Sequence, residues 1–487
     1  MRPRVCARAL VLLLPLLLGA CAGFDIDQAS MPLTTPAPPS DYADMTPTQR
    51  REHEKLVASY GGAYNDPELK ALIQQVVERL VAASERPDLK YRVTVLNSPA
   101  INAFALPDGS LYVTRGLLAL ANDTSELSSV LAHEMAHVIA SHATIREGQV
   151  KQAVLVSRVI SDVVNDPDLG ALAMQKSKRT LASFSRGQEL EADAIGVGIA
   201  ARAGFDPYGA TRFLNEMGRY AQVRSSTITS ANASKPEMDL LSSHPATPER
   251  ISIATANARH YAEPDKGERD RDAYLSAIDG MIYGDDPKEG FVRGRKFFHP
   301  KLGFTFTAPA GFSLENTSQA VLGASQSGNE AMRLDAVRVS ADQSLGQYLS
   351  SGWIEGVEIN SVETLTVNGF TAATAVARGE QWSFRMFAIR FGSDVYRMIF
   401  AARELTPELD QQFREAASTF RRVSSDEAQT VKPLRVRVVK VGFSDTTEKL
   451  IGRMMVPDKQ QELFLVLNGL EPGAKLKYGE KIKILAE

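Results

Sequence analysis

The stretch His133-Glu134-Met135-Ala136-His137 decides how the first half of this 487-residue chain is interpreted. On an α-helix, positions four apart lie about 40° from each other around the axis, so both imidazoles project from one face. Glu134 lies about 100° from His133, where its carboxylate can reach a metal-bound water but is badly placed to bind the metal. Two histidines at this spacing with a glutamate between them are typical of a hydrolytic zinc site.

The residues around this stretch support a helix. Asp123 and Glu126 form a start that resembles a capping box. Apolar residues at helical spacing follow, namely Leu127, Val130, Leu131, Ala132, Val138 and Ile139. The pattern predicts a helix over residues 124–150, and similar patterns predict helices over 66–83, 188–203 and 207–220.

A tetrahedral zinc ion needs at least one further protein ligand. One common source is a third histidine six residues after the second with a glycine midway, but Ala143 and Ala140 occupy those places. His142 lies about 140° from His137 around a continuous helix, so we interpret it as a surface or second-face residue.

A second predicted helix offers carboxylates instead. It runs from about Gln188 to Ala203, stops at Gly204, and carries Glu189 and Asp193 four residues apart. One carboxylate can bind the metal while the other accepts a hydrogen bond from a ligating imidazole. A solvated acidic helix face is the alternative interpretation.

These two segments together resemble the gluzincin metallopeptidases that include HtpX, the CAAX prenyl endopeptidases and the periplasmic protease BepA. The resemblance covers roughly residues 47–260, and segments 102–109 and 111–118 resemble that family's strand-turn-strand segment ahead of the zinc helix. It implies a mainly α, zincin-like domain with a small β-sheet and one Zn²⁺ per chain. It also implies roles for five residues: zinc ligands His133, His137 and Glu189, general base Glu134, and Asp193 behind a ligating imidazole.

The resemblance extends to Ser243-His244-Pro245 and Arg250, which match a loop that lies near the metal in relatives. His244 and Arg250 are candidate donors to the oxyanion that forms during peptide hydrolysis. His244 is equally a candidate fourth ligand that closes the site without substrate, or an imidazole in a polar loop. HtpX and the CAAX enzymes carry several membrane helices, and the body of this chain has no apolar run of that length. The BepA-like branch therefore fits better, although we see none of its helical repeats.

A hairpin is predicted ahead of the zinc helix. Ile101 to Leu106 is a short apolar run that Pro107-Asp108-Gly109 turns back into Leu111 to Thr114. An edge strand beside the metal can pair with an extended substrate through main-chain hydrogen bonds. An ordinary structural hairpin is the alternative.

The N-terminus predicts export. Three arginines precede the apolar run from Ala9 to Leu18, and Leu18-Gly19-Ala20-Cys21 resembles a bacterial lipobox. Residues 1–20 are therefore predicted to be a lipoprotein signal peptide, with Cys21 lipidated. Ala22 after the cysteine resembles the sorting pattern for the outer membrane, so we expect a periplasmic protein anchored there by its lipid. A stray cysteine in a signal peptide is the alternative.

Charge and composition limit the kinds of binding partner that are expected. Removing residues 1–20 takes the formal charge from −3 to −6, which argues against nucleic acid. Residues 21–46 are predicted to be a flexible tether because they are rich in Pro, Ser, Thr and Asp. The mature body would hold no cysteine other than Cys21, so it can form no internal disulfide.

The chain is too long for one core, and its pattern predicts several domains. Residues 47–265 are assigned to the zinc metallopeptidase domain and 266–290 to a linker with a short helix. Alternating apolar residues predict an α+β domain over 291–422, which includes a hairpin from strands 384–391 and 395–401 and a helix after Thr406-Pro407. After a linker at 423–433, residues 434–487 resemble a LysM module, a small βααβ fold associated with peptidoglycan. Gly442-Phe443-Ser444-Asp445-Thr446 departs from the usual Gly-Asp-Thr of that module.

Two classes of function are compatible with these features. The first is a zinc endopeptidase of the bacterial envelope that removes misfolded or unassembled proteins, with Glu134 as general base. The second is a cell-wall-tethered binding or chaperone-like protein in which zinc is mainly structural. Three protein ligands with an open fourth position favour the first class.

Overall fold

The structure is a computed structural model that describes residues 45–146, 148, 184–225, 240–317, 319–351, 356–430, 432–456 and 458–487. The predictions for residues 1–20, for Cys21 and for most of the 21–46 tether lie outside these residues. Among the described residues, no helix has both the length and the apolar character needed to cross a membrane.

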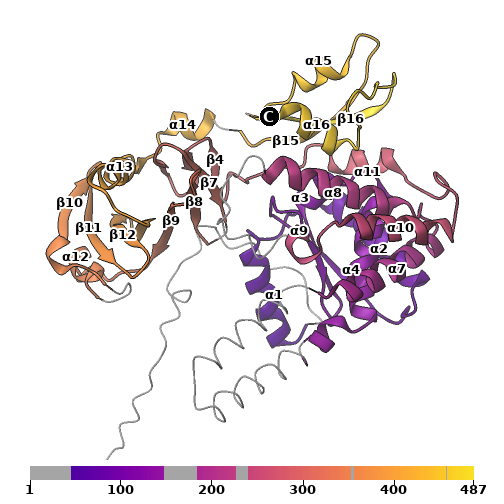
Figure 1. Cartoon of the computed structure of the whole chain (residues 1–487), viewed down its shortest axis with the longest axis horizontal. Helices are drawn as coiled ribbons and strands as arrows, with labels where there is room; N and C mark the ends of the chain where they lie inside the picture. Colours follow the sequence, from indigo (N-terminus) through magenta and orange to yellow (C-terminus); the bar gives the residue numbers. More distant parts are fainter. Residues whose placement is uncertain are drawn as a thin grey trace, which may run out of the picture.

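The first part is mainly helical, as predicted (Figure 1). Its helices are α1 (Pro47–Ser59), α2 (Pro67–Ala83), α3 (Arg115–Leu120), α4 (Thr124–Ile139), α7 (Arg186–Arg202), α8 (Gly209–Ser225), α9 (Leu240–Ser243), α10 (Pro248–Arg259) and α11 (Arg271–Ile278). Three strands, β1 (Arg92–Leu96), β2 (Ala103–Ala105) and β3 (Ser110–Thr114), form a sheet in the order β1-β3-β2. The predicted hairpin is the antiparallel pair β2 and β3, and β2 is an edge strand.

Helix α4 begins where the sequence predicts and ends earlier. The Asp123 side chain accepts a hydrogen bond from the backbone of Glu126, while the Glu126 carboxylate accepts from the backbone of Asn122 rather than from the cap residue itself. The helix stops at Ile139, so the predicted extension to residue 150 is wrong. Ser141 has a φ of 56°, in the left-handed region that cannot continue an α-helix. The chain changes direction there before a helical turn at 142–146.

Helices α4 and α7 pack against each other at very short range. Gly196 on α7 lies so close to α4 that a Cβ there would meet the His133 backbone nitrogen at 3.0 Å. A larger residue at this position would therefore push the two helices apart. This close approach brings the carboxylates of α7 to the imidazoles of α4.

The second part is rich in β-structure and has cores of its own. Strands β10 (Glu363–Val367), β11 (Phe370–Arg378), β12 (Ser383–Phe391), β13 (Asp394–Ala402), β9 (Glu330–Val337), β8 (Val321–Ser325) and β7 (Phe312–Asn316) form, in that order, a seven-stranded sheet. A second sheet has the order β14 (Arg421–Arg422), β6 (Phe304–Thr307), β5 (Lys296–His299) and β4 (Phe291–Arg293). The remaining elements are α12 (Leu345–Leu349), the 3₁₀ turn η2 (Ile359–Ser361), α13 (Pro407–Ser418) and α14 (Ser425–Thr430).

Two local predictions for this part are confirmed. Strands β12 and β13 form the predicted hairpin, with Phe391 opposite Asp394 across Gly392-Ser393. Thr406 caps α13 and Pro407 is its first residue. The α+β character therefore follows from the alternation and the turn residues that the sequence displays.

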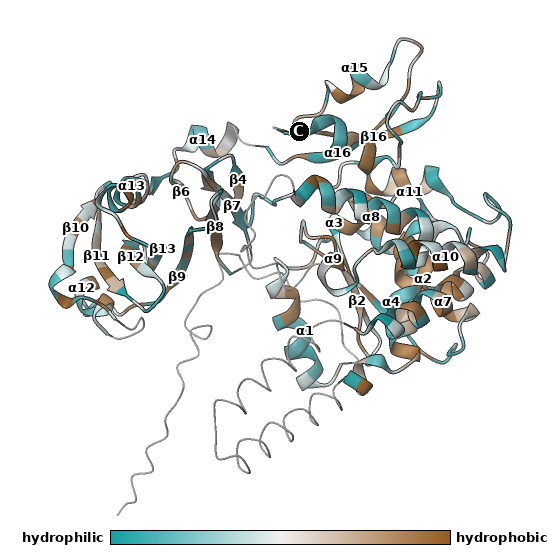
Figure 2. Ribbon diagram, in the orientation of Figure 1, coloured by the Kyte–Doolittle hydropathy of each residue, from teal (hydrophilic) through white to brown (hydrophobic). Residues whose placement is uncertain are grey.

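The C-terminal part has the order β15 (Arg435–Lys440), α15 (Thr447–Ile451), α16 (Gln460–Leu467) and β16 (Lys481–Ala486), with the two strands antiparallel. It shares one hydrophobic core with the first part. In Figure 2 the hydrophobic residues of β16 lie next to the first part, and Val436, Phe464 and Ile484 belong to the same core as Leu131 on α4. The backbone at the start of β15 also accepts hydrogen bonds from residues just after α11: Val436 accepts from Gly280, and Leu434, the residue before the strand, accepts from Tyr283. Residues 434–487 thus contribute to the core that supports helix α4.

Candidate metal centre

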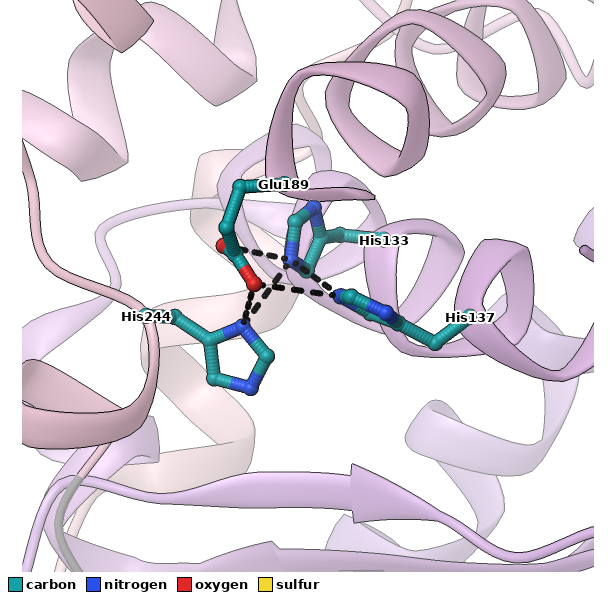
Figure 3. A group of neighbouring side chains, drawn as sticks. All are labelled: His133, His137, Glu189 and His244. Atoms are coloured by element: carbon teal, nitrogen blue, oxygen red, sulfur yellow. Dashed lines mark hydrogen bonds and ion pairs between the residues drawn. The ribbon is translucent and has the colours of Figure 1, made fainter. Parts of the chain in front are cut away.

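Side chains from three segments converge on one point inside the first part (Figure 3). His133 and His137 project from α4, Glu189 comes from the first turn of α7, and His244 lies directly after α9. All four residues are buried. The structure therefore brings the predicted helix pair and the predicted loop together, as the sequence indicates.

The distances between the donor atoms suit a tetrahedral zinc ion. Zinc bound at about 2.0–2.2 Å requires ligand atoms roughly 3.3–3.6 Å apart, the edge of a tetrahedron of that size. Nε2 of His133 and Nε2 of His137 lie 3.1 Å apart, and each lies 3.6 Å from an oxygen of Glu189. Nδ1 of His244 lies 3.4 Å from Nε2 of His133 and 2.8 Å from Oε1 of Glu189.

The charges of the site also suit a divalent cation. Three carboxylates, those of Glu134, Glu189 and Asp193, lie here with one guanidinium, that of Arg250. With neutral imidazoles this buried group carries a formal charge of −2, which a Zn²⁺ ion would neutralise. Oε1 of Glu134 is buried without a hydrogen-bond partner among the described residues. The residues present therefore fit zinc.

Asp193 and Arg250 support the His133 side of the site. Oδ1 of Asp193 lies 3.0 Å from Nδ1 of His133, and Arg250 donates from Nε and Nη2 to the same carboxylate at 2.7 Å each. Burial alone would lower the pKa of His133, but Asp193 and Glu189 outweigh it and raise the pKa to about 9 when no cation is present. The predicted position of Asp193 behind a ligating imidazole agrees with this contact.

The His137 side is supported by a residue that the sequence interpretation missed. His142 is 2% exposed, and its Nδ1 lies 3.0 Å from Nδ1 of His137. The interpretation of His142 as a surface residue is wrong, because it assumed an unbroken helix past Ser141. No glycine or proline marks the break, so the sequence carries no signal for it.

Arg250 and His244 have different relations to the site. The Arg250 guanidinium spans two carboxylates, since its Nη1 also lies 2.9 Å from Oε2 of Glu189. This geometry places it behind the ligands and does not favour the predicted oxyanion role. His244 points at the donor cluster, with Nδ1 facing Glu189 and Nε2 3.9 Å from Glu134.

A cavity of about 40 Å³ adjoins the catalytic candidates. Its polar lining includes Glu134 and His244, and its apolar lining comes from Val130, Phe213, Leu214, Met217 and Leu240. Burial raises the pKa of the Glu134 carboxyl, while His244 and His133 oppose that rise. A carboxyl with a raised pKa is better matched to accepting and returning a proton near neutral pH.

Comparisons with known proteins point to one family. The model of peptidase family M48 matches residues 67–258. Mitochondrial metalloendopeptidase OMA1 of Schizosaccharomyces pombe is 32% identical over 154 residues, which are 30% of this chain and 43% of that protein. The beta-barrel assembly-enhancing protease of Yersinia pestis is 32% identical over 202 residues, 40% of each chain. Its Escherichia coli K12 counterpart is 28% identical over 221 residues, 44% of this chain and 43% of that protein. The chain spans less than half the length of each of these curated relatives.

Proposed function

Because residues 67–258 form a zinc metallopeptidase domain of peptidase family M48, of the gluzincin, BepA-like type, we propose that this chain is an endopeptidase of the bacterial cell envelope. Its substrates would be misfolded or unassembled envelope proteins. The observation that carries the activity is the buried set of His133, His137 and Glu189 with Glu134 beside it, which matches the donor distances and charge that zinc requires.

The residues of this chain have separate tasks in peptide hydrolysis. Zinc, when bound, supplies a Lewis acid that polarises a carbonyl and makes water more acidic. Glu134 takes a proton from the attacking water and returns it to the leaving amine. Asp193 holds His133 from behind, and Arg250 fixes Asp193 and Glu189 in turn. Glu134 is buried and lies beside the apolar lining of the adjoining cavity, which limits its contact with bulk water.

An extended substrate would bind at strand β2. This strand is the edge of its sheet and packs beside α4. Main-chain pairing at a sheet edge gives affinity with little demand on the substrate's sequence, which suits a protease that acts on unfolded segments. At the entry to β2, Ile101 accepts a hydrogen bond from Leu240 of α9, so the segment that carries His244 lies next to this edge.

The test compares Glu134→Gln with the parent on an unfolded protein such as casein. The variant should keep zinc and its thermal stability and lose roughly 10²- to 10⁴-fold in kcat. A chelator should abolish the parent's activity, and added zinc should restore it. Glu263→Gln, at an exposed position, is the matched control and should cleave like the parent. Full activity in Glu134→Gln would reject the mechanism.

His244 supports a second candidate function. With Nδ1 of His244 directed at the cluster, four protein ligands surround one point, as in closed structural zinc sites. A cell-wall-tethered binding or chaperone-like protein with a structural zinc would have this arrangement. His244→Ala separates the two: a gating residue predicts retained zinc and equal or faster cleavage, whereas a structural ligand predicts loss of zinc and of thermal stability.

Location and attachment are further proposals from the sequence. We propose a periplasmic protein that is anchored to the outer membrane by a lipid on Cys21, because Ala22 after the cysteine resembles the sorting pattern for that membrane. Cys21→Ala should then release the protein from the membrane fraction.

The C-terminal part offers a cavity of about 440 Å³ lined by residues that include Thr446, Gln461 and Lys475, where peptidoglycan would bind. Co-sedimentation with purified peptidoglycan tests that proposal.

A further inference from the structure

His142 lies between a zinc ligand and a carboxylate on a different helix. Its Nδ1 is 3.0 Å from Nδ1 of His137, and its Nε2 is 3.3 Å from Oε2 of Glu191. The His142 side chain is 2% exposed, whereas that of Glu191 is 59% exposed. The three groups thus form a chain of contacts from the metal centre to the surface.

The protons along this chain follow from the partners. An ionised carboxylate only accepts hydrogen bonds, so the proton of neutral His142 lies on Nε2 and is donated to Glu191. Nδ1 of His142 is then an acceptor and takes a hydrogen bond from Nδ1–H of His137. This leaves the lone pair of His137 on Nε2, the atom that faces His133 and Glu189. The tautomer that zinc requires is therefore the one that the contacts select.

The orientation of the His137 ring is also held by its surroundings. Phe184 stacks on it with ring centroids 4.0 Å apart, and His142 meets it at a centroid distance of 5.0 Å and an interplanar angle of 69°. The left-handed conformation of Ser141 is what turns His142 back towards this ring. Helix α7 supplies a carboxylate to each of the two imidazoles: Asp193 contacts His133, and Glu191 contacts His142, which in turn contacts His137.

We propose that His142 and Glu191 are positioning residues of the metal centre, which together fix the tautomer and orientation of His137 for zinc. The inference rests on the proposed function, because it assumes that His137 is a zinc ligand. Residues that orient a ligating imidazole in this way contribute about 10- to 100-fold to metal affinity. Water can replace the exposed Glu191 as an acceptor, so its contribution is smaller.

The experiment measures zinc affinity in the full chain, with Glu134→Gln as the parent so that cleavage has no part in the result. Zinc dissociation constants come from competition with a chromophoric chelator, and the visible spectrum of the Co²⁺-substituted protein reports ligand geometry. His142→Leu should weaken zinc binding about 10- to 100-fold and shift the Co²⁺ spectrum. His142→Asn keeps an acceptor near the position of Nδ1 and should stay within about threefold of the parent. Glu191→Ala should weaken binding only several-fold.

His53→Leu is the matched control, since His53 is also buried and its Nδ1 lies 2.8 Å from the Tyr112 hydroxyl on another part of the fold. It should lower thermal stability and leave zinc affinity unchanged. Parent-like zinc affinity in His142→Leu would overturn the proposal, as would equal losses in His142→Asn and His142→Leu. If His142→Leu does not fold, the zinc affinities of Glu191→Ala and His142→Asn test the proposal. It then predicts a loss of several-fold for Glu191→Ala and a loss of no more than about threefold for His142→Asn. A failed cleavage test with intact zinc affinities would count against the proposed function and leave this inference standing.

Discussion

Helix α4 carries a group of buried charged side chains at each end, and the two groups differ in how their charge is balanced. At the C-terminal end, three carboxylates face one guanidinium, and Nε2 of His133 and Nε2 of His137 lie 3.1 Å apart, as two ligands of one metal ion would. At the N-terminal end, the three carboxylates of Asp123, Glu126 and Asp206 face three basic side chains, those of Arg212, Arg269 and Lys483. Among the described residues, the C-terminal group has a formal excess of two negative charges that a divalent cation would balance, whereas the carboxylates of the N-terminal group are matched by cationic side chains of the protein.

Lys483 is the unexpected member of the N-terminal group. Its side chain is fully buried, and Nζ donates to the backbone oxygens of Ala119, Leu120 and Ala121 at the end of α3. Burial lowers its pKa to about 7. Because Lys483 lies on β16, the C-terminal part supplies both apolar packing and a buried hydrogen-bond donor to the segment that leads into α4. The comparison shows that buried charged side chains alone do not identify a catalytic site. A candidate site is indicated by metal-donor atoms whose negative charge is not balanced by nearby cationic side chains.

The largest effect is expected at the C-terminal end, from Glu189→Gln. Removing one charged partner from a buried set costs about 4 kcal/mol, which corresponds to roughly a thousandfold loss of zinc affinity. Proteolysis should be lost with the metal. Zinc competition assays measure the effect, and zinc binding equal to that of the unmodified chain would show that the C-terminal group does not need a cation.

The next largest effect is expected from Lys483→Met at the other end. It leaves three buried carbonyl oxygens without their donor and, below about pH 7, also removes a positive charge near Glu126, so the free energy of unfolding should fall by ~3 kcal/mol. The zinc dissociation constant of the folded protein should not change. Chemical denaturation measures the first quantity and chelator competition the second.

Lys481→Met is the matched control for Lys483→Met. Lys481 lies on the same strand but its side chain is 31% exposed, 3.7 Å from the exposed Asp272. Its replacement should cost less than about 1 kcal/mol. Equal losses of unfolding free energy in Lys481→Met and Lys483→Met would contradict the prediction that the buried lysine contributes more than the exposed one.

The two ends also differ in how far the sequence predicts them. The spacing of His133, Glu134 and His137 within five residues predicts a metal site on one helix. Glu189 and Asp193 have the same four-residue spacing on a second helix. His142 was missed because helical geometry was extended through Ser141, whose left-handed conformation depends on its tertiary surroundings.

The N-terminal group could not be predicted, because its members are far apart in the chain. Lys483 lies 364 residues from Ala119, and no local pattern links them. The fold shows the same division between local and long-range signals. Hairpins and caps such as β12–β13 and Thr406 follow local rules, whereas the packing of residues 434–487 against the first part depends on contacts that a single sequence does not display.

A pH dependence should appear next to the N-terminal group, at Glu216 on α8. Burial raises its pKa to about 7, against the attraction of Arg219. Since the pKa of Glu216 is higher in the folded than in the unfolded chain, the contribution of the Glu216 carboxyl to stability is fully present below about pH 4.5. That contribution is lost as the pH rises through 7. Glu216→Gln should therefore be relatively more stable than the unmodified chain at pH 8, by ~2 kcal/mol, and not at pH 4.5. Denaturation midpoints across this range measure it, and parallel curves for the two proteins would contradict the assignment.

The smallest effect is expected from Arg269→Gln at the outer edge of the N-terminal group. Arg269 donates from Nε to Oδ2 of Asp123 at 2.8 Å, but its side chain is 36% exposed and water can take its place. Asp123 keeps the Ser125 hydroxyl at 2.6 Å, the Glu126 backbone at 2.9 Å and the Arg212 guanidinium at 3.6 Å. The loss in unfolding free energy should be about 1 kcal/mol or less, with zinc affinity and cleavage unchanged. A loss as large as that of Lys483→Met would mean that the charges at this end are interdependent, so that balance there depends on the whole set and not on its buried members.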